Sequence, residues 1–471
     1  MSTILSADDL NDFIAPGVAC VKPVEITKTS SAAEIQIGID GEPVEISTDN
    51  GESKLEPAKI SLTDCLACSG CITSAEAVLV ELQSPKELFK ALDDKEKIFV
   101  VSICHQTRAS LARACEMSVA TIDAKLRHVF AERLGFRYVV GTEVGRAISL
   151  VQEAEEAWKR RDQPGPVLSS ICPGWTCYVE KSHPEMLPFL SHVRSPQQIT
   201  GHLIKELIAR LHGTKTCHVY HVSIMPCFDK KLEAARPDFE VGGSRECDLV
   251  LTAREVVEMI STEFGTAFDM LPDAQLAAAQ VTPQGWPVEE QWLSNAGSSS
   301  GGYLAYTLAK VQSMHPGSEV VTLSGKNTDL MEYQIMHENK LIFHGAQVYG
   351  FRSIQNLVRK LKPSKGKVVR VRSTKSDPMQ WDYVELMACP GGCINGGGQL
   401  AAPENLPTRL FIEQMEQAYK QIPLAVVSEE TALSYLGAIG AEPTADLLLT
   451  TYKPLAKENN IPEALAVGTQ W

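Results

Sequence analysis

Four cysteines in three separated motifs of this sequence have the surroundings of metal ligands. They are Cys172 in Ser-Ile-Cys-Pro-Gly-Trp, Cys227 in Met-Pro-Cys-Phe-Asp-Lys, and Cys389 with Cys393 in Ala-Cys-Pro-Gly-Gly-Cys-Ile-Asn-Gly-Gly-Gly. Prolines stiffen the approaches, and glycines let the backbone pass close to a bound inorganic group. Because thiolate sulfur favours zinc and iron–sulfur clusters, these residues predict a metal cage rather than a disulfide or a single catalytic thiol.

A second cysteine set lies far upstream, where Cys65, Cys68 and Cys71 are separated by two residues each. This spacing wraps three thiolates around one face of a four-iron cluster, as in bacterial ferredoxins. No fourth cysteine follows closely. Cys20 is the only cysteine further upstream and is the natural fourth ligand, whereas the competing candidate, Cys104, closes a predicted buried strand. A zinc site is the alternative to a cluster at this set.

The downstream cysteines follow predicted strands. Short apolar runs predict strands over 167–171, 218–224 and 383–387, and each run ends just before one of the three cysteine motifs or within it. Further predicted elements are the strand 98–103 and the helices 106–117, 143–159, 196–211 and 303–314. This alternation predicts an α/β protein with mostly parallel sheets flanked by helices. Ligand sites of such sheets lie at the carboxyl ends of the strands, so we expect these cysteines to share one site.

The chain is expected to divide into four parts. Residues 1–96 are predicted to form a small N-terminal cluster-binding segment, and residues 97–212 and 213–404 to form two α/β lobes. Residues 405–471 are predicted to form a C-terminal helical region and tail, with a helix over 409–420.

The composition narrows the class of protein. The chain has 471 residues and a formal net charge of -14, with no long Lys/Arg run, so nucleic acid is not an expected partner. No segment reaches the ~18 consecutive apolar residues that a membrane-spanning helix needs. The stretch from Met1 to Asp12 is polar and does not resemble a secretory signal. Thirteen cysteines without such a signal indicate a reducing compartment, so we expect the cytoplasm, with the nucleus as a second location.

The three downstream motifs resemble the active-site signatures of iron-only hydrogenases. The likeness extends over roughly residues 97–420 and includes Ser195-Pro-Gln-Gln, Ser300-Gly-Gly before a helix, and Gly350 after a strand. The resemblance implies an iron-only-hydrogenase-like fold. It also implies that Cys172, Cys227, Cys389 and Cys393 ligate a [4Fe-4S] cluster, with Cys393 bridging to a di-iron subsite and Lys230 facing that subsite.

The sequence departs from the hydrogenases at one decisive position. Their first motif reads Cys-Cys-Pro, and its first cysteine relays protons to the di-iron centre, but here that position is Ile171. An isoleucine neither donates nor accepts a proton, so hydrogen turnover should be lost. The N-terminal part also lacks a full ferredoxin domain with a chain of accessory clusters. We therefore expect a protein that is not an enzyme and has no catalytic residue.

The motif Ser-Ile-Cys-Pro-Gly-Trp, the set of Cys20 with Cys65, Cys68 and Cys71, and the final Trp471 together resemble the eukaryotic hydrogenase-like Nar family. This resemblance implies two [4Fe-4S] clusters and a role in the cytosolic iron–sulfur protein assembly machinery. The family links an upstream cluster scaffold to a targeting complex that contains a WD40 propeller and hands clusters to cytosolic and nuclear apoproteins. The resemblance also implies that Trp471 docks on that complex.

Two other interpretations remain at this stage. One is a true iron-only hydrogenase or another iron–sulfur redox enzyme, against which Ile171 argues. The other is a structural zinc protein that acts as a scaffold, against which the Gly-Gly-Gly run behind Cys393 argues, because a zinc site does not need such close packing of the backbone.

Overall fold

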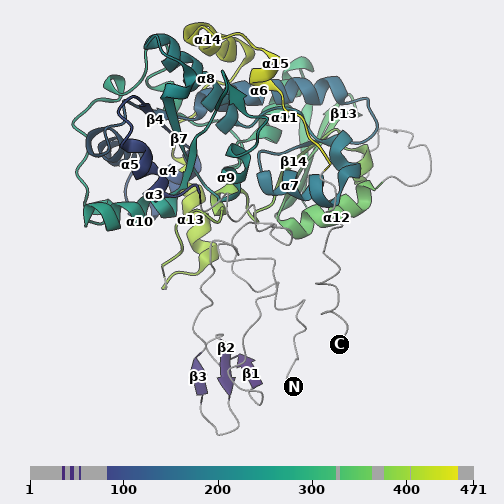
Figure 1. The fold of residues 1–471 in the computed structure, drawn as a ribbon. Helices are drawn as coiled ribbons and strands as arrows, with labels where there is room; N and C mark the ends of the chain where they lie inside the picture. Colours follow the sequence, from purple (N-terminus) through teal and green to yellow (C-terminus); the bar gives the residue numbers. More distant parts are fainter. Residues whose placement is uncertain are drawn as a thin grey trace, which may run out of the picture.

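The structure is a computed structural model that describes residues 34–37, 43–46, 52–54, 82–324, 329–362, 376–403 and 405–454. Two β-sheets with covering helices dominate it. The first sheet has the strand order β10-β7-β4-β5 and is parallel throughout. The second has the order β11-β12-β13-β14-β6. In Figure 1, β4 and β7 lie on the left of the molecule and β13 and β14 on the right, with α9 between them.

The strands of the first sheet are β4 (Ile98–Ile103), β5 (Tyr138–Gly141), β7 (Val219–Met225) and β10 (Leu249–Thr252). Those of the second are β6 (Val167–Ser169), β11 (Glu319–Ser324), β12 (Leu330–His337), β13 (Lys340–Tyr349) and β14 (Tyr383–Met387). Two smaller sheets pair β1 (Glu34–Ile37), β2 (Pro43–Ile46) and β3 (Glu52–Lys54), and β8 (Glu240–Val241) with β9 (Ser244–Arg245).

The described α-helices are α3 (Pro85–Leu92), α4 (His105–Ala114), α5 (Val119–Arg127), α6 (Glu143–Arg160), α7 (Pro173–Ser182), α8 (Pro196–Leu211), α9 (Asp229–Ala234), α10 (Ala253–Phe264), α11 (Tyr303–Met314), α12 (Phe351–Leu361), α13 (Thr408–Lys420), α14 (Glu429–Ile439) and α15 (Ala445–Leu448). The strands predicted over 98–103 and 383–387 and the helices predicted over 196–211 and 303–314 are confirmed to the residue. The two helices begin at Pro196 and directly after Gly302, residue types that mark helix starts and turns.

The expectation of an α/β fold with mostly parallel sheets is confirmed. The second sheet adds an antiparallel edge, because β11 and β12 pair antiparallel with their neighbours while β13, β14 and β6 pair parallel. Glu338 and Asn339 adopt positive φ angles of 48° and 61° in the tight connection between β12 and β13. Such a short turn can join only antiparallel strands.

The two large sheets interleave along the chain. β6 comes from the predicted first lobe, 97–212, but pairs with β14 in the second sheet. β7 and β10 come from the predicted second lobe, 213–404, but belong to the first sheet. A boundary at residue 212 therefore does not separate the two sheets. Each sheet contains strands from before and from after this residue.

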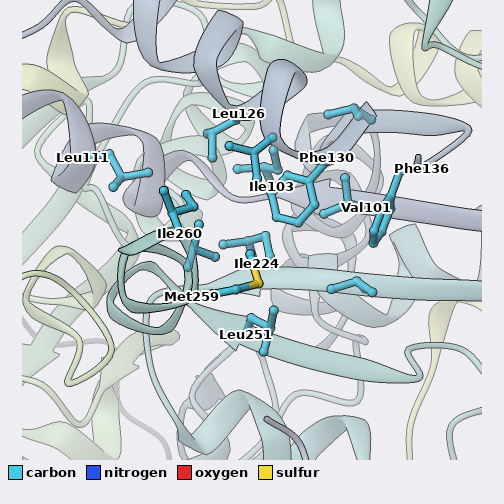
Figure 2. Packing of buried hydrophobic residues seen from close by; sticks show 14 of the residues in the cluster. Val101, Ile103, Leu111, Leu126, Phe130, Phe136, Ile224, Leu251, Met259 and Ile260 are labelled. Carbon is cyan, nitrogen blue, oxygen red and sulfur yellow. The ribbon is translucent and has the colours of Figure 1, made fainter. Parts of the chain in front are cut away.

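Apolar side chains between the first sheet and its helices form one of the buried cores. Figure 2 shows Ile103 and Ile224 from neighbouring strands, with Leu126 and Phe130 on one side and Met259 toward the other. All are 0–1% exposed, so the sheet is covered on this face by α4, α5, the π-helical turn His128–Arg133 and α10. Burial on both sides explains why these strands are nearly continuous in apolar residues.

Several helices were not among the predicted elements: α5, α7, α9, α14 and α15. α7 begins with Pro173 directly after Cys172, and proline is well suited to the first helical position, although a Pro-Gly pair also fits a loop. α14 begins where the Ser428 side chain accepts the Thr431 N–H and ends at Gly440 in a left-handed conformation. Among the described residues, no helix combines the length and the apolar character that crossing a membrane requires.

Candidate metal centre

The four downstream cysteines meet at the carboxyl ends of strands from both sheets. Cys172 follows β6 and is the N-terminal cap of α7, Cys227 follows β7, and Cys389 and Cys393 follow β14. All four line one cavity of about 600 Å³, part of it open to solvent. Cys172 is buried and the other three are half-buried, which is the exposure expected of side chains that border a cavity. The nine described cysteines are all free thiols.

Hydrogen bonds to the backbone hold the loop between Cys389 and Cys393. An Asp329 carboxylate oxygen accepts the Gly391 N–H at 2.8 Å, and the Ser300 hydroxyl oxygen accepts the Cys393 N–H at 3.0 Å. Gly391 and Gly392 have φ angles of 71° and 91°. A Cβ atom at Gly392 would lie 2.3 Å from the Ser300 Oγ atom, so this position requires glycine both for its conformation and for its space.

The glycine run that follows Cys393 packs directly on the second cysteine motif. The Gly398 N–H donates to the Pro226 carbonyl at 2.9 Å, and a Cβ atom at Gly396 would lie 2.3 Å from the same oxygen. Residue 226 follows β7 of the first sheet, and residue 396 lies in the segment after β14 of the second. The close approach of these two backbones therefore holds Cys227 beside the Cys389–Cys393 loop.

The surroundings of these four cysteines favour the neutral thiol over the charged thiolate. Burial raises the pKa of Cys172 to about 11, and the nearby Asp229 carboxylate adds to this effect. Burial also raises the pKa of Cys389 well above its usual range, followed by the effects of the Cys172 and Cys227 thiols. Burial and then Cys172 raise the pKa of Cys393 to about 12. Four thiols that mutually oppose ionisation need a positively charged group among them to become ligands, and bound metal ions supply that charge.

Two further residues that the sequence singled out, Ile171 and Lys230, line the same cavity. Ile171 lies beside Cys172 in the cavity wall, where it adds only an apolar surface. Lys230 also lines the cavity, and its ammonium group donates to Glu233 at 2.7 Å, so its charge is paired. The Ser195 hydroxyl donates to the other carboxylate oxygen of Glu233. The predicted cluster ligands Cys20, Cys65, Cys68 and Cys71, and the predicted docking residue Trp471, lie outside the described residues.

Sequence reasoning assigned no role at this site to five further lining residues, although Gln197 lies in the Ser195-Pro-Gln-Gln motif. Cys104, Gln106, Thr142, Arg146 and Gln197 line the cavity together with the four thiols. Cys104 directly follows β4, and Thr142 directly follows β5, so both occupy the position after a strand that marked the other cysteines. Packed thiols and threonines are too common at such positions for this signal to stand out.

Single-ion sites of the usual type are not found in this part of the chain. Among the described residues, no three His, Cys, Asp or Glu side chains are close enough together to hold one metal ion. The cavity nevertheless brings together the four thiols of the three motifs, Cys172, Cys227, Cys389 and Cys393.

Comparison with known proteins identifies the class. The family model described as "Iron only hydrogenase large subunit, C-terminal domain" matches residues 97–397. Among solved structures, an apo [FeFe]-hydrogenase HydA1 from Chlamydomonas reinhardtii superposes with a TM-score of 0.60 at 22% sequence identity, covering 81% of this chain and 99% of that protein. The fold is thus that of an iron-only-hydrogenase-like protein, as the sequence predicted.

Closer relatives identify the family. A cytosolic Fe-S cluster assembly factor NAR1 from Yarrowia lipolytica is 49% identical over 458 residues, covering 91% of this chain and 93% of the relative. A NAR1 protein from Saccharomyces cerevisiae is 37% identical over 506 residues and matches over the full length of both chains. The chain belongs to the hydrogenase-like Nar family of cytosolic Fe-S cluster assembly factors.

Proposed function

We propose that this protein takes part in cytosolic iron–sulfur protein assembly as a cluster-bearing factor without hydrogenase activity. The observation that carries the proposal is the cavity in which Cys172, Cys227, Cys389 and Cys393 meet, within a hydrogenase-like fold whose relatives are named as assembly factors. A [4Fe-4S] cluster takes four thiolates, one on each iron, and so needs a wider cage than a single ion does.

The N-terminal set supplies a second [4Fe-4S] site in this proposal. Cys20, Cys65, Cys68 and Cys71 are its ligands. When bound, the central cluster would transfer electrons or serve as a structural group. The side chain at position 171 of the cavity wall is an isoleucine, so the cavity lacks the thiol that hydrogenases use there for proton relay.

We propose the partners from the resemblance to the Nar family. The protein links an upstream cluster scaffold to the WD40-containing targeting complex, which supplies clusters to cytosolic and nuclear apoproteins. It works in the cytoplasm, with the nucleus as a second location. The relatives' names support the cytosolic assembly role.

Metal and sulfide analysis of the anaerobically purified full chain tests the two-cluster proposal. We expect about eight iron and about eight acid-labile sulfide per chain, which is the content of two cubanes. Cys247→Ala is a suitable control, because Cys247 is a buried free thiol that does not border the cavity. Zinc in place of iron would support a structural scaffold, and rapid hydrogen evolution from a reduced dye would support a redox enzyme; either result contradicts the proposal.

Deletion of Trp471 tests the proposed docking on the targeting complex. A large aromatic side chain can anchor in a pocket, so we expect binding to weaken by at least ~2 kcal/mol, a loss typical of a hot-spot residue. Both clusters should be retained, because the chain is already held to the folded part upstream of the deleted residue. There the Tyr452 hydroxyl donates to the Ser191 carbonyl at 2.8 Å.

The measurement is the equilibrium affinity for the purified WD40-containing complex. Gln470→Ala is the matched control in the same tail and should bind as the wild type does. Equal affinity of the truncated and full-length proteins would refute the docking role.

A further inference from the structure

The cavity of the four cysteines has a second, polar end. Lys230 and Arg146 both line this cavity, but they come from different elements. Lys230 lies in α9, which begins two residues after Cys227. Arg146 lies in the first turn of α6, which follows β5 of the parallel sheet, and so belongs to a different part of the wall.

Three buried polar groups in this wall have atoms without a hydrogen-bond partner in the protein. They are the Arg146 Nε atom, the Thr142 hydroxyl and the Gln197 side-chain oxygen. Arg146 is 3% exposed, and the other two side chains are each 1% exposed. Buried polar atoms are rarely left unpaired, and three of them on one cavity indicate that something polar occupies the space between them.

The hydrogen bonds of Arg146 all go to uncharged partners. Its guanidinium donates to the Tyr419 hydroxyl at 2.7 Å and to the Asn295 side-chain oxygen at 3.3 Å. The Glu143 carboxylate lies 3.9 Å from the Nε atom, beyond hydrogen-bond distance. Burial raises the pKa of Glu143 to about 8, which favours its uncharged form.

Helix dipoles give the same part of the cavity a positive potential. Three helices begin at residues of this wall or next to them. Cys104 is the N-cap residue of α4, Thr142 is the N-cap residue of α6, and Gln197 lies in the first turn of α8. Helix N-termini present partial positive charge and stabilise anions. The Thr142 side chain makes no capping hydrogen bond to α6, so its hydroxyl is available to a ligand.

We propose that this polar end is a binding site for a small soft monoanion of the hydrosulfide type, held by Arg146, Thr142 and Gln197 beside the cage of four thiols. The rest of the wall consists largely of apolar and sulfur-containing side chains, including Ile171, Met225 and Met387. Such a wall disfavours strongly hydrated anions such as phosphate, because they lose more hydration energy on entry. Hydrosulfide also carries one proton, which the Gln197 oxygen accepts.

This inference rests on the proposed function only in that a cluster fills the thiol end of the cavity. The test uses the full-length, cluster-loaded protein under anaerobic conditions and bromide as the probe anion, followed by the line width of its nuclear magnetic resonance signal. We expect saturable broadening that hydrosulfide reverses and phosphate at equal ionic strength does not. Bromide affinity should fall at least ~10-fold in Arg146→Gln, the loss of a hydrogen bond to a charged group, and ~2–10-fold in Thr142→Val.

Arg133→Gln is the matched control, because Arg133 is an exposed arginine outside the cavity wall, and it should bind bromide as the wild type does. If Arg146→Gln fails to fold, Thr142→Val decides, since it preserves shape and removes only the hydroxyl. Absence of saturable bromide binding to iron-loaded wild type, or wild-type affinity in Thr142→Val, overturns the inference. Iron content is measured on the same samples, so protein without iron contradicts the proposed function instead.

Discussion

The two sheets contribute unequally to the metal centre. The mixed sheet delivers three thiols, because Cys172 follows β6 and Cys389 and Cys393 follow the adjacent β14. The parallel sheet delivers one of the four proposed ligands, Cys227 after β7, together with Cys104 and Thr142 after β4 and β5. The comparison suggests that one half of the molecule presents most of the cage, while the other half closes it and supplies its polar wall.

Removal of one thiol from each half should have the largest effects and test this comparison directly. Cys389→Ala removes a ligand from the half that presents three, so we expect the central cluster to be lost and iron to fall from about eight to about four per chain. In Cys227→Ala the three remaining thiols still lie together, so part of the central iron should survive anaerobic purification and be lost in air.

Iron and sulfide analysis before and after exposure to air provides the measurement for both variants, with Cys247→Ala as the control. Equal loss of iron from the two variants before exposure would show that the halves contribute equally, contrary to the comparison.

The Cys389–Cys393 loop of the mixed-sheet half depends on glycine at one position more than at the next. Gly392 has φ 91° and ψ -169°, a region open only to glycine, and Ser300 leaves no room for a Cβ atom. We expect Gly392→Ala to cost ~1–3 kcal/mol of unfolding free energy from the conformation alone, and to lower central iron occupancy.

Gly391→Ala is the matched comparison, since Gly391 has φ 71° and a Cβ atom there meets nothing within 4 Å. Its expected cost is ~1–2 kcal/mol, with iron content unchanged. Urea unfolding of the iron-loaded proteins measures both costs, and a larger loss from Gly391→Ala would show that the contact with Ser300 is unimportant.

The two proposed clusters should also differ in how easily they are removed. The central thiols lie between two packed halves, whereas Cys65, Cys68 and Cys71 lie close together in a polar stretch of sequence with Cys20 far upstream. Local opening costs less where fewer apolar contacts break, so chelators and oxygen should remove the N-terminal cluster first.

Cysteine variants assign the signals: Cys68→Ala should abolish the fast phase of iron release, and Cys389→Ala the slow phase. Retention of the fast phase in Cys68→Ala would mean that the central cluster is the labile one.

Introducing a cysteine at position 171, where the proposal expects hydrogenases to carry a proton-relay thiol, should have the smallest effect. Ile171→Cys places a thiol beside Cys172, but a positioned acid–base group contributes only ~10²–10⁴-fold to an existing reaction. Without an occupied di-iron subsite there is no reaction to accelerate, so hydrogen evolution from a reduced dye should stay at background in both wild type and variant. Turnover in the variant alone would mean that Ile171 is the only barrier to activity.

Much of the fold could be predicted because its signals are local. The strand Ile98–Ile103 and the helix Pro196–Leu211 follow from apolar periodicity and from the proline or polar residues at their ends. The helix α7 escaped prediction because its first residues, Pro173 and Gly174, fit a loop equally well, and the choice depends on Trp175 being fully buried in the surrounding core.

By itself, the sequence determined the eight candidate ligands, the class of protein and the departure at Ile171, because residue identity and short spacing are properties of the chain. Only the tertiary structure decided that β6 pairs with β14 and so places Cys172 beside Cys389, that Pro226 holds the glycines after Cys393, and that Arg146 shares their cavity. These contacts join residues that are far apart in sequence. No local pattern records them, because they depend on how the two sheets pack.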